Sequence, residues 1–167
     1  MTMNVTDTEV GTLRAGFLGG GFMAAVHSRA VRAAQATPAL IASSRPESSK
    51  TAARALGIAE AASDPSELIA ADIDVVHVCT PNATHAAYAA AALAAGKHVI
   101  CEKPLATSAD EALALATTAR ESGLVAAVPF VYRYHPQVRE MRARIARGEL
   151  GALLTLDCSY LQDWLLD

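Results

Sequence analysis

The chain has 167 residues, of which 52% are hydrophobic and 19% are charged, enough for a domain with a substantial core. Its formal net charge of -3 gives no electrostatic reason to expect a nucleic acid or an anionic membrane as partner. The longest apolar run, residues 86–95, is too short for a membrane span, which needs about 20 residues.

Apolar runs alternate with helical patterns along most of the chain. The expected strands cover residues 13–18, 39–43, 57–61, 74–80, 97–101 and 124–130. The expected helices cover residues 22–34, 46–56, 64–70 and 109–121, with two more between Asn82 and Gly96 and between Pro136 and Gly148. Asn82 is a predicted N-cap, and Ser108 is predicted to form a capping box with Glu111. This alternation predicts an α/β fold with a doubly wound parallel sheet, which binds ligands outside the carboxyl ends of its strands.

The cysteines and histidines indicate neither disulfides nor a metal. Cys79, Cys101 and Cys158 lie in strand-like stretches at unrelated spacings, which is typical of reduced thiols. The five histidines stand at no ligand spacing with Cys, Asp or Glu, so no metal site is predicted.

The polar opening, residues 1–13, lacks the apolar stretch of a signal peptide. We therefore expect a cytoplasmic location.

The first expected strand is followed by GGGFMA at residues 19–24, which fits the dinucleotide-binding pattern G-x-G-x-x-G/A. Gly19 permits the turn, and Gly21 lets the backbone approach a pyrophosphate. Phe22 and Met23 then begin a helix whose free N–H groups and positive dipole end face the phosphates. The alternative is a tight strand-to-helix turn without a ligand.

The end of the second expected strand bears on the choice of cofactor. It reads Ser43-Ser44-Arg45-Pro46, and the first carboxylate after the strand is that of Glu47. An acid there would accept from the ribose 2′-hydroxyl and favour NAD, whereas Ser44 and Arg45 suit a 2′-phosphate. The sequence thus predicts NADP, with NAD as the alternative. The same residues can also begin the next helix, and the two interpretations are compatible.

Two further motifs, CTPNATH at 79–85 and CEKPLA at 101–106, accompany the glycine loop. With all three motifs the chain resembles the Gfo/Idh/MocA family of NAD(P)-dependent oxidoreductases over nearly its whole length. The resemblance implies that four residues of the first motif line the cofactor near its ribose and nicotinamide, namely Thr80, Pro81, Asn82 and His85. His85 has a helix cap or a packing role as its alternative. A methyltransferase could share the glycine loop, but it gives no reason for Glu-Lys-Pro.

The Glu-Lys-Pro motif begins at Glu102, where the fifth expected strand ends. By the resemblance, Lys103 binds the substrate hydroxyl and the nicotinamide ribose, and Glu102 belongs to the same cofactor site. An ammonium beside a hydride acceptor can stabilise charge on the reacting oxygen or assist its proton transfer, so Lys103 is the predicted catalytic residue. Glu102 can orient that side chain, and the bond before Pro104 could be cis. The resemblance also makes Arg133 a candidate cofactor contact.

The pattern changes after Gly148. Residues 153–161 alternate in polarity, which predicts a strand packed on one face. We interpret residues 1–150 as the NAD(P)-binding domain and residues 151–167 as the first strand of a truncated α+β domain. By the resemblance, that second domain supplies a catalytic Asp and His, most of the substrate pocket and much of a homo-oligomer interface.

The expected function is an oxidoreductase acting on a sugar, a polyol or a related hydroxyl or carbonyl compound. The chain is expected to be its N-terminal cofactor-binding part and to be inactive alone. The alternative is a dinucleotide-binding module without turnover.

Overall fold

The computed structural model describes residues 12–163. Their contacts divide between Pro129 and Phe130 into two units. Most of the polar opening, and the last four residues of the predicted second-domain segment, lie outside the described residues. The domain boundary predicted at residue 150 stays a prediction.

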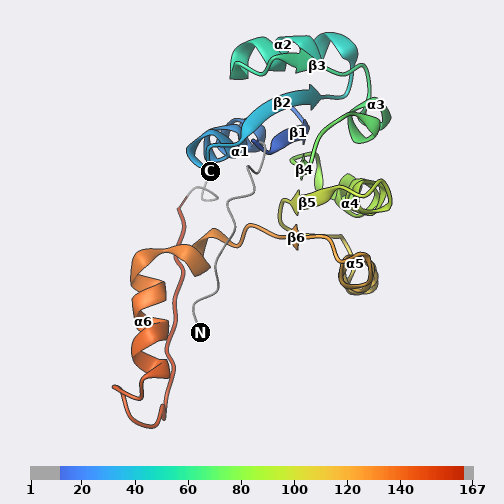
Figure 1. Ribbon diagram of the computed structural model, residues 1–167. Coiled ribbons are helices and arrows are strands. Elements are labelled where there is room, and N and C mark those ends of the chain that lie inside the picture. Colours follow the sequence, from blue (N-terminus) through green and yellow to red (C-terminus); the bar gives the residue numbers. More distant parts are fainter. Residues whose placement is uncertain (1–11, 164–167) are drawn as a thin grey trace, which may run out of the picture. The chain divides into compact units, whose positions relative to one another are not determined.

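The first unit is built on a six-stranded parallel sheet of order β3-β2-β1-β4-β5-β6 (Figure 1). The strands are β1 (Arg14–Leu18), β2 (Thr37–Ala42), β3 (Glu60–Ala61), β4 (Val75–Val78), β5 (His98–Cys101) and β6 (Ala126–Ala127). The strand order reverses at β1, which pairs with β2 on one side and with β4 on the other. The predicted doubly wound α/β fold is confirmed. Ligands of such sheets bind at this reversal.

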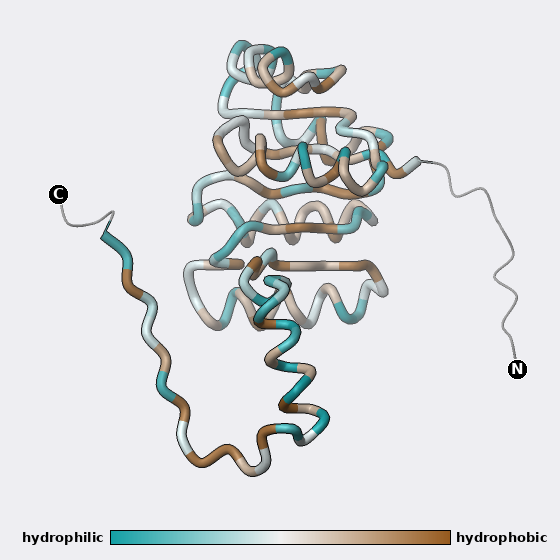
Figure 2. The backbone as a smooth tube through the Cα atoms, turned by 90° about the vertical axis from the view of Figure 1, so that its left-hand side faces the viewer, coloured by the Kyte–Doolittle hydropathy of each residue, from teal (hydrophilic) through white to brown (hydrophobic). Residues whose placement is uncertain are grey.

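Helices cover both faces of the sheet. They are α1 (Phe22–Ala33), α2 (Pro46–Leu56), α3 (Pro65–Ala70), α4 (His85–Ala94) and α5 (Ala109–Ser122). Val31 of α1 and Ala52 of α2 pack with Phe17 in one cluster, while α3, α4 and α5 contribute to a second cluster that includes Leu115. Figure 1 shows α1 on the opposite side of the strands from α4 and α5. A parallel sheet buried on both faces needs near-continuous apolar strands, which Figure 2 shows in brown.

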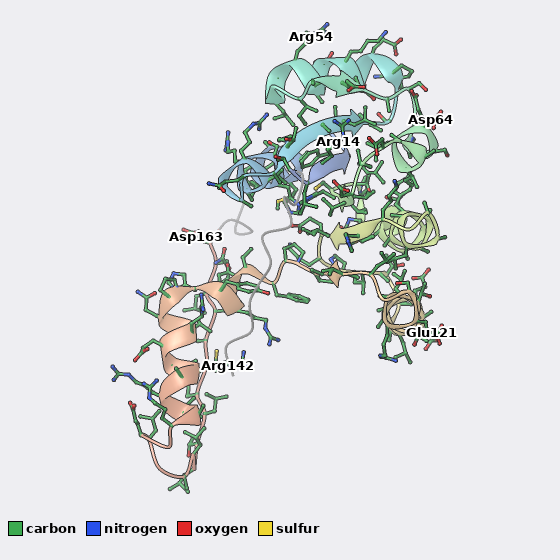
Figure 3. The ribbon with its side chains drawn as sticks, in the orientation of Figure 1. Arg14, Arg54, Asp64, Glu121, Arg142 and Asp163 are labelled. Carbon is green, nitrogen blue, oxygen red and sulfur yellow. The ribbon has the colours of Figure 1, made fainter. Side chains whose placement is uncertain are left out.

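Charged side chains lie on the outer sides of these helices, as Figure 3 shows for Arg54 on α2 and Glu121 on α5. None of the helices described within residues 12–163 has the length and apolar character to cross a bilayer. The predicted cytoplasmic location stays a prediction.

Local hydrogen bonds set the helix starts. Ser108 is the N-cap of α5, since its hydroxyl accepts from the Glu111 N–H; the Glu111 carboxylate accepts from the Ser108 hydroxyl and not from the backbone N–H that a full capping box requires. The Asn82 cap is wrong. The Pro81 carbonyl accepts from the Thr84 N–H, which makes a short 3-10 turn, η1 (Asn82–Thr84), and delays the start of α4 to residue 85.

The sixth strand is shorter than its sequence predicts. Residues 124–130 were expected to form a strand, but only Ala126 and Ala127 pair, and they pair with β5 alone. Strand β6 is the edge of the sheet in the described residues, so one side of its backbone has no ladder partner.

The second unit contains a 3-10 turn, η2 (Val131–Tyr134), and α6 (Pro136–Ala146). Helix α6 begins at Pro136 and ends before Gly148, as predicted. The strand predicted over residues 153–161 is not formed among the described residues. A strand needs a neighbour for its hydrogen-bond ladder, and residues 152–163 have none. They are exposed, although the Tyr160 hydroxyl contacts that of Tyr132.

Candidate functional site

A cleft of about 710 Å³ opens where β1, β2 and β4 end. This volume lies within the range of small-molecule and cofactor sites. Seven of the predicted cofactor-binding residues line it together: Gly19, Gly21, Phe22, Met23, Ser44, Thr80 and Pro81. Eight other lining residues were not predicted as cofactor contacts: Leu18, Gly20, Ala42, Ser43, Pro65, Cys79, Thr84 and Tyr88.

The glycine turn brings the strand ends close together. Gly19 has a φ of 97°, and a Cβ atom there would lie 2.4 Å from the carbonyl oxygen of Cys79. The Gly19 N–H donates to the carbonyl of Ala42 at 2.8 Å. The turn after β1 therefore touches the ends of both neighbouring strands, and only glycine leaves room for this approach.

The floor of the cleft is the start of α1. Gly21 is the N-cap and has no side chain to cap the helix, and the first turn contains no acidic residue. A Cβ atom on Gly21 would meet no atom within 4 Å. The first N–H groups of a helix have no partner within it, and together with the helix dipole they attract anions. These residues fit the pyrophosphate of a dinucleotide.

Arg45 both begins helix α2 and lies where it could contact a cofactor phosphate. Arg45 is the N-cap of α2, and its carbonyl accepts from the hydroxyl of Ser49. Its guanidinium makes no hydrogen bond or ion pair within residues 12–163. It lines a second hollow, of about 470 Å³, together with Ser43 and Glu47. The helix start therefore leaves the guanidinium free for a ligand.

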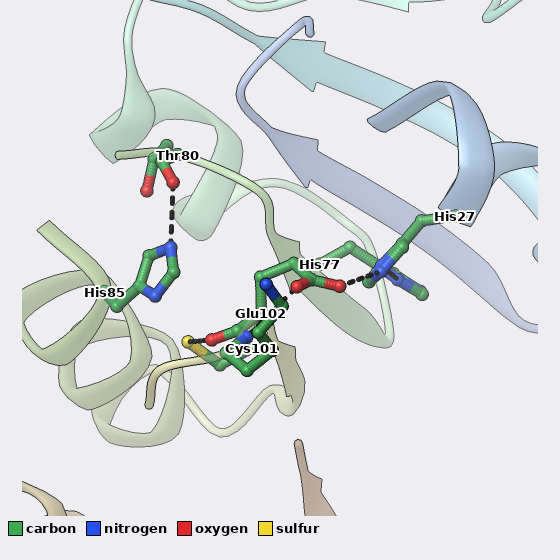
Figure 4. A network of polar contacts seen from close by, with 7 residues as sticks. His27, His77, Thr80, His85, Cys101 and Glu102 are labelled. Carbon is green, nitrogen blue, oxygen red and sulfur yellow. Dashed lines mark hydrogen bonds and ion pairs between the residues drawn. The ribbon is translucent and has the colours of Figure 1, made fainter. Parts of the chain in front are cut away.

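His85 is 1% exposed and connects two loops. Its Nδ1 lies 2.7 Å from the carbonyl oxygen of Pro104, and its Nε2 lies 2.8 Å from that of Thr80 (Figure 4). A neutral ring has one N–H and can donate to one of these carbonyls, whereas a doubly protonated ring donates to both. The contacts support the packing role of His85. Its predicted role beside the cofactor stays a prediction.

The Glu-Lys-Pro motif directs its acid inward and its lysine outward. Glu102 is 5% exposed, with Oε1 3.0 Å from Nε2 of His27, and its Oε2 accepts from the Lys103 N–H at 3.1 Å. The Lys103 side chain is exposed, and the bond to Pro104 is cis. A cofactor contact of Glu102 and the catalytic role of Lys103 stay predictions.

A second buried histidine continues this network. Nδ1 of His27 lies 3.0 Å from Nδ1 of His77, whose ring stacks on Phe17. Burial, and to a smaller extent the electrostatic effect of His27, lower the pKa of His77 to about 3. His77 is therefore neutral near pH 7.

The thiols at the ends of β4 and β5 are held protonated. Burial is the main cause that raises the pKa of Cys79 to about 12, with a smaller effect from the Glu102 carboxylate. The pKa of Cys101 is also raised to about 12 for the same two reasons. Neither thiol is activated as a nucleophile.

The remaining predicted residues lie outside the cleft lining. Asn82 is exposed in η1, and Arg133 lies in η2 of the second unit. Their predicted cofactor contacts stay predictions. Within residues 12–163, no group of three His, Cys, Asp or Glu side chains is placed to hold a metal ion.

The family described as an oxidoreductase family with an NAD-binding Rossmann fold matches residues 13–130. The chain belongs to the Gfo/Idh/MocA family. The family that the glycine loop and the Glu-Lys-Pro motif indicated is therefore confirmed.

Among its relatives, levoglucosan dehydrogenase from Pseudarthrobacter phenanthrenivorans is 41% identical over 93% of this chain and 42% of its own length. D-xylose 1-dehydrogenase (NADP(+)) 2 from Haloferax volcanii is 36% identical over 78% of this chain and 40% of its own length. The chain thus spans about two fifths of the length of these Gfo/Idh/MocA relatives.

Solved structures of similar oxidoreductases have the same fold over this part of their chains. Levoglucosan dehydrogenase in complex with NADH and levoglucosan superposes with a TM-score of 0.83, at 38% identity over 86% of this chain and 41% of that one. An oxidoreductase domain protein from Kribbella flavida superposes with a TM-score of 0.89, at 36% identity over 95% of this chain and 45% of that one.

Proposed function

We propose that this chain is the cofactor-binding part of an NADP-dependent dehydrogenase or reductase that acts on a sugar, a polyol or a related hydroxyl or carbonyl compound. The observation that carries the proposal is the cleft, in which the Gly19 turn, the start of α1 and the loop after β4 lie together. The relatives named for levoglucosan and D-xylose support a sugar-like substrate.

Lys103 is the residue we assign to the chemistry. It follows β5 directly, its side chain is exposed, and its peptide N–H is held by the buried Glu102 carboxylate. A bound nicotinamide dinucleotide would supply or accept the hydride. The Lys103 ammonium would hold the substrate oxygen, stabilise the negative charge that develops there, and give it a proton when the substrate is reduced; in the oxidation direction the neutral Lys103 amine would take that proton.

The preference for NADP rests on the end of β2. Ser44 lines the cleft and Arg45 lines the second hollow, and the Arg45 guanidinium has no partner in the described residues. Charged hydrogen bonds to a phosphate contribute roughly 1.5–3 kcal/mol each. One relative is named for NADP(+) and another was solved with NADH, so both cofactors belong in the test.

Substrate turnover, in this proposal, also needs sequence that the relatives have beyond the matched two fifths of their length. That part would supply the substrate pocket, a proton-transferring Asp and His, and a homo-oligomer interface. The matched part would suffice for cofactor binding, because the cleft is lined entirely by residues of the first unit.

Two assays on the purified chain test this proposal. The first is a fluorescence titration with NADPH and with NADH, and the second is a dehydrogenase assay across sugars and polyols. Saturable binding without turnover is the expected result. Robust turnover would place the catalytic machinery within these 167 residues, and failure to bind either dinucleotide would contradict the proposal.

Lys103→Met should bind cofactor within a few-fold of the unmodified chain, since the predicted contacts of Lys103 matter most in the transition state.

A further inference from the structure

The buried side chains of Glu102 and His27 connect the Lys103 peptide to α1. Figure 4 shows the contact between these two side chains. The Glu102 N–H donates to the Val78 carbonyl at 2.9 Å, which fixes the end of β5 against β4. Beyond that point, the Glu102 side chain turns inward, and its two oxygens take different partners. Oε1 faces Nε2 of His27, and Oε2 accepts from the Lys103 N–H.

A buried carboxylate is costly, and it is tolerated only where its oxygens are hydrogen-bonded. If position 102 served packing alone, an apolar side chain would avoid that cost. Glu102 is instead bonded at both oxygens, to α1 on one side and to the next peptide on the other. The Glu102 side chain therefore connects His27 on α1 with the Lys103 peptide, which an apolar packing residue could not do.

We take Glu102 as an ionised carboxylate. An ionised carboxylate only accepts, so Nε2 of His27 then carries the hydrogen that faces Glu102. Nδ1 of His27 then either accepts from His77 or donates to it, and both arrangements are possible because His77 is neutral. The hydrogen on Nε2 is required in each case.

We propose that His27 is a positioning residue for Lys103, acting through the Glu102 carboxylate. The inference rests on the proposed function, in which Lys103 carries the chemistry. His27 lies on α1, the helix whose first residues line the cleft, so one chain of contacts connects the phosphate end of the site with the peptide of the lysine. His27 does not touch the cofactor cleft itself and acts only through Glu102.

Two variants separate positioning from packing. In His27→Gln the side-chain amide can replace Nε2 and donate to Glu102, while the contact with His77 is lost. In His27→Asn the shorter amide replaces Nδ1 and keeps the contact with His77, while Glu102 loses its donor. Arg29→Ala is the control, because Arg29 is exposed on the same helix and has no partner in the described residues.

The readout is the backbone amide of Lys103 in the 15N-labelled 167-residue chain. In His27→Asn its hydrogen exchange should become about tenfold faster, since the carboxylate that accepts from it is no longer held. His27→Gln and Arg29→Ala should stay within about twofold of the unmodified chain. Equal exchange in the Asn and Gln variants, with equal losses of melting temperature, would overturn the proposal and leave His27 as a packing residue.

A second measurement needs no variant. The imidazole 15N spectrum of the unmodified chain should show His27 protonated at Nε2, and a bare Nε2 would contradict the proposal. Neither measurement requires cofactor binding. Failure to bind NADPH would therefore count against the proposed function alone, while the Lys103 amide still decides the role of His27.

Discussion

Gly19 and Cys79 are in contact through backbone atoms, and a single added Cβ atom on Gly19 would lie 2.4 Å from the Cys79 carbonyl oxygen. The ends of β1 and β4 meet at this point, and the cleft opens directly above it. The left-handed φ of 97° at Gly19 adds a second reason why a larger residue does not fit.

Gly19→Ala should therefore be more damaging than a glycine substitution at a comparable φ in open space. Gly96 has a φ of 74° and no atom near its missing Cβ, so Gly96→Ala should cost about 1–2 kcal/mol from the backbone conformation alone. Gly19→Ala adds the collision with Cys79, so its loss of unfolding free energy and of NADPH affinity should both be larger. Urea denaturation and fluorescence titration measure the two effects. Equal losses at the two positions would contradict the close approach.

His77 should make the protein less stable in mild acid. Its folded pKa of about 3 lies below the ordinary value of 6.5, so between these values the unfolded chain binds a proton that the folded chain does not. Stability should fall as the pH drops from about 6.5 towards 3, by up to about 1.4 kcal/mol per pH unit. His77→Asn keeps a partner for His27 and should reduce this slope, measured by urea denaturation at several pH values. An unchanged slope would show that His77 titrates normally.

The three cysteines should differ in reactivity. At pH 8 a thiol with a pKa of about 12 is ionised in about one molecule in ten thousand, so Cys79 and Cys101 should react slowly with iodoacetamide. Cys158 is exposed and should be labelled first. Mass spectrometry of the peptides gives the order, and labelling in urea is the control in which all three should react. Labelling of Cys79 at the rate of Cys158 would contradict the raised pKa of that thiol.

Cofactor preference should depend on Arg45. NADPH should bind more tightly than NADH, and Arg45→Ala should remove most of the difference, roughly ten- to a hundredfold for one charged contact. Arg54→Ala, an exposed change on the same helix, is the matched control and should leave the ratio unchanged. Calorimetry that shows NADH binding equally well or better in the unmodified chain would contradict an NADP preference.

The residues that could be placed from sequence were those whose signal is local. The turn at Gly19 and the N-cap at Ser108 each lie within a few residues, and both were predicted correctly. The contact between His27 and Glu102 spans 75 residues, and nothing in the spacing of either residue indicates it. Only the pairing of strands and the packing of α1 bring these two side chains together.

Strand predictions failed where a strand lacks neighbours. Residues 124–130 and 153–161 both have the apolar content of strands, but pairing depends on a partner that the local sequence does not contain. Residues 124–130 find one on a single side, and only Ala126 and Ala127 pair. Residues 153–161 find none within the described part of the chain.

We propose that a dinucleotide binds in the cleft between the Gly19 turn and the loop after β4. A titration of the 15N-labelled chain with NADPH, followed through its backbone amide signals, tests this binding site. Saturable shifts should be concentrated at residues 19–24, 42–45 and 79–84, with smaller changes near Lys103. Shifts confined to other parts of the chain, or no saturable shift at all, would contradict it.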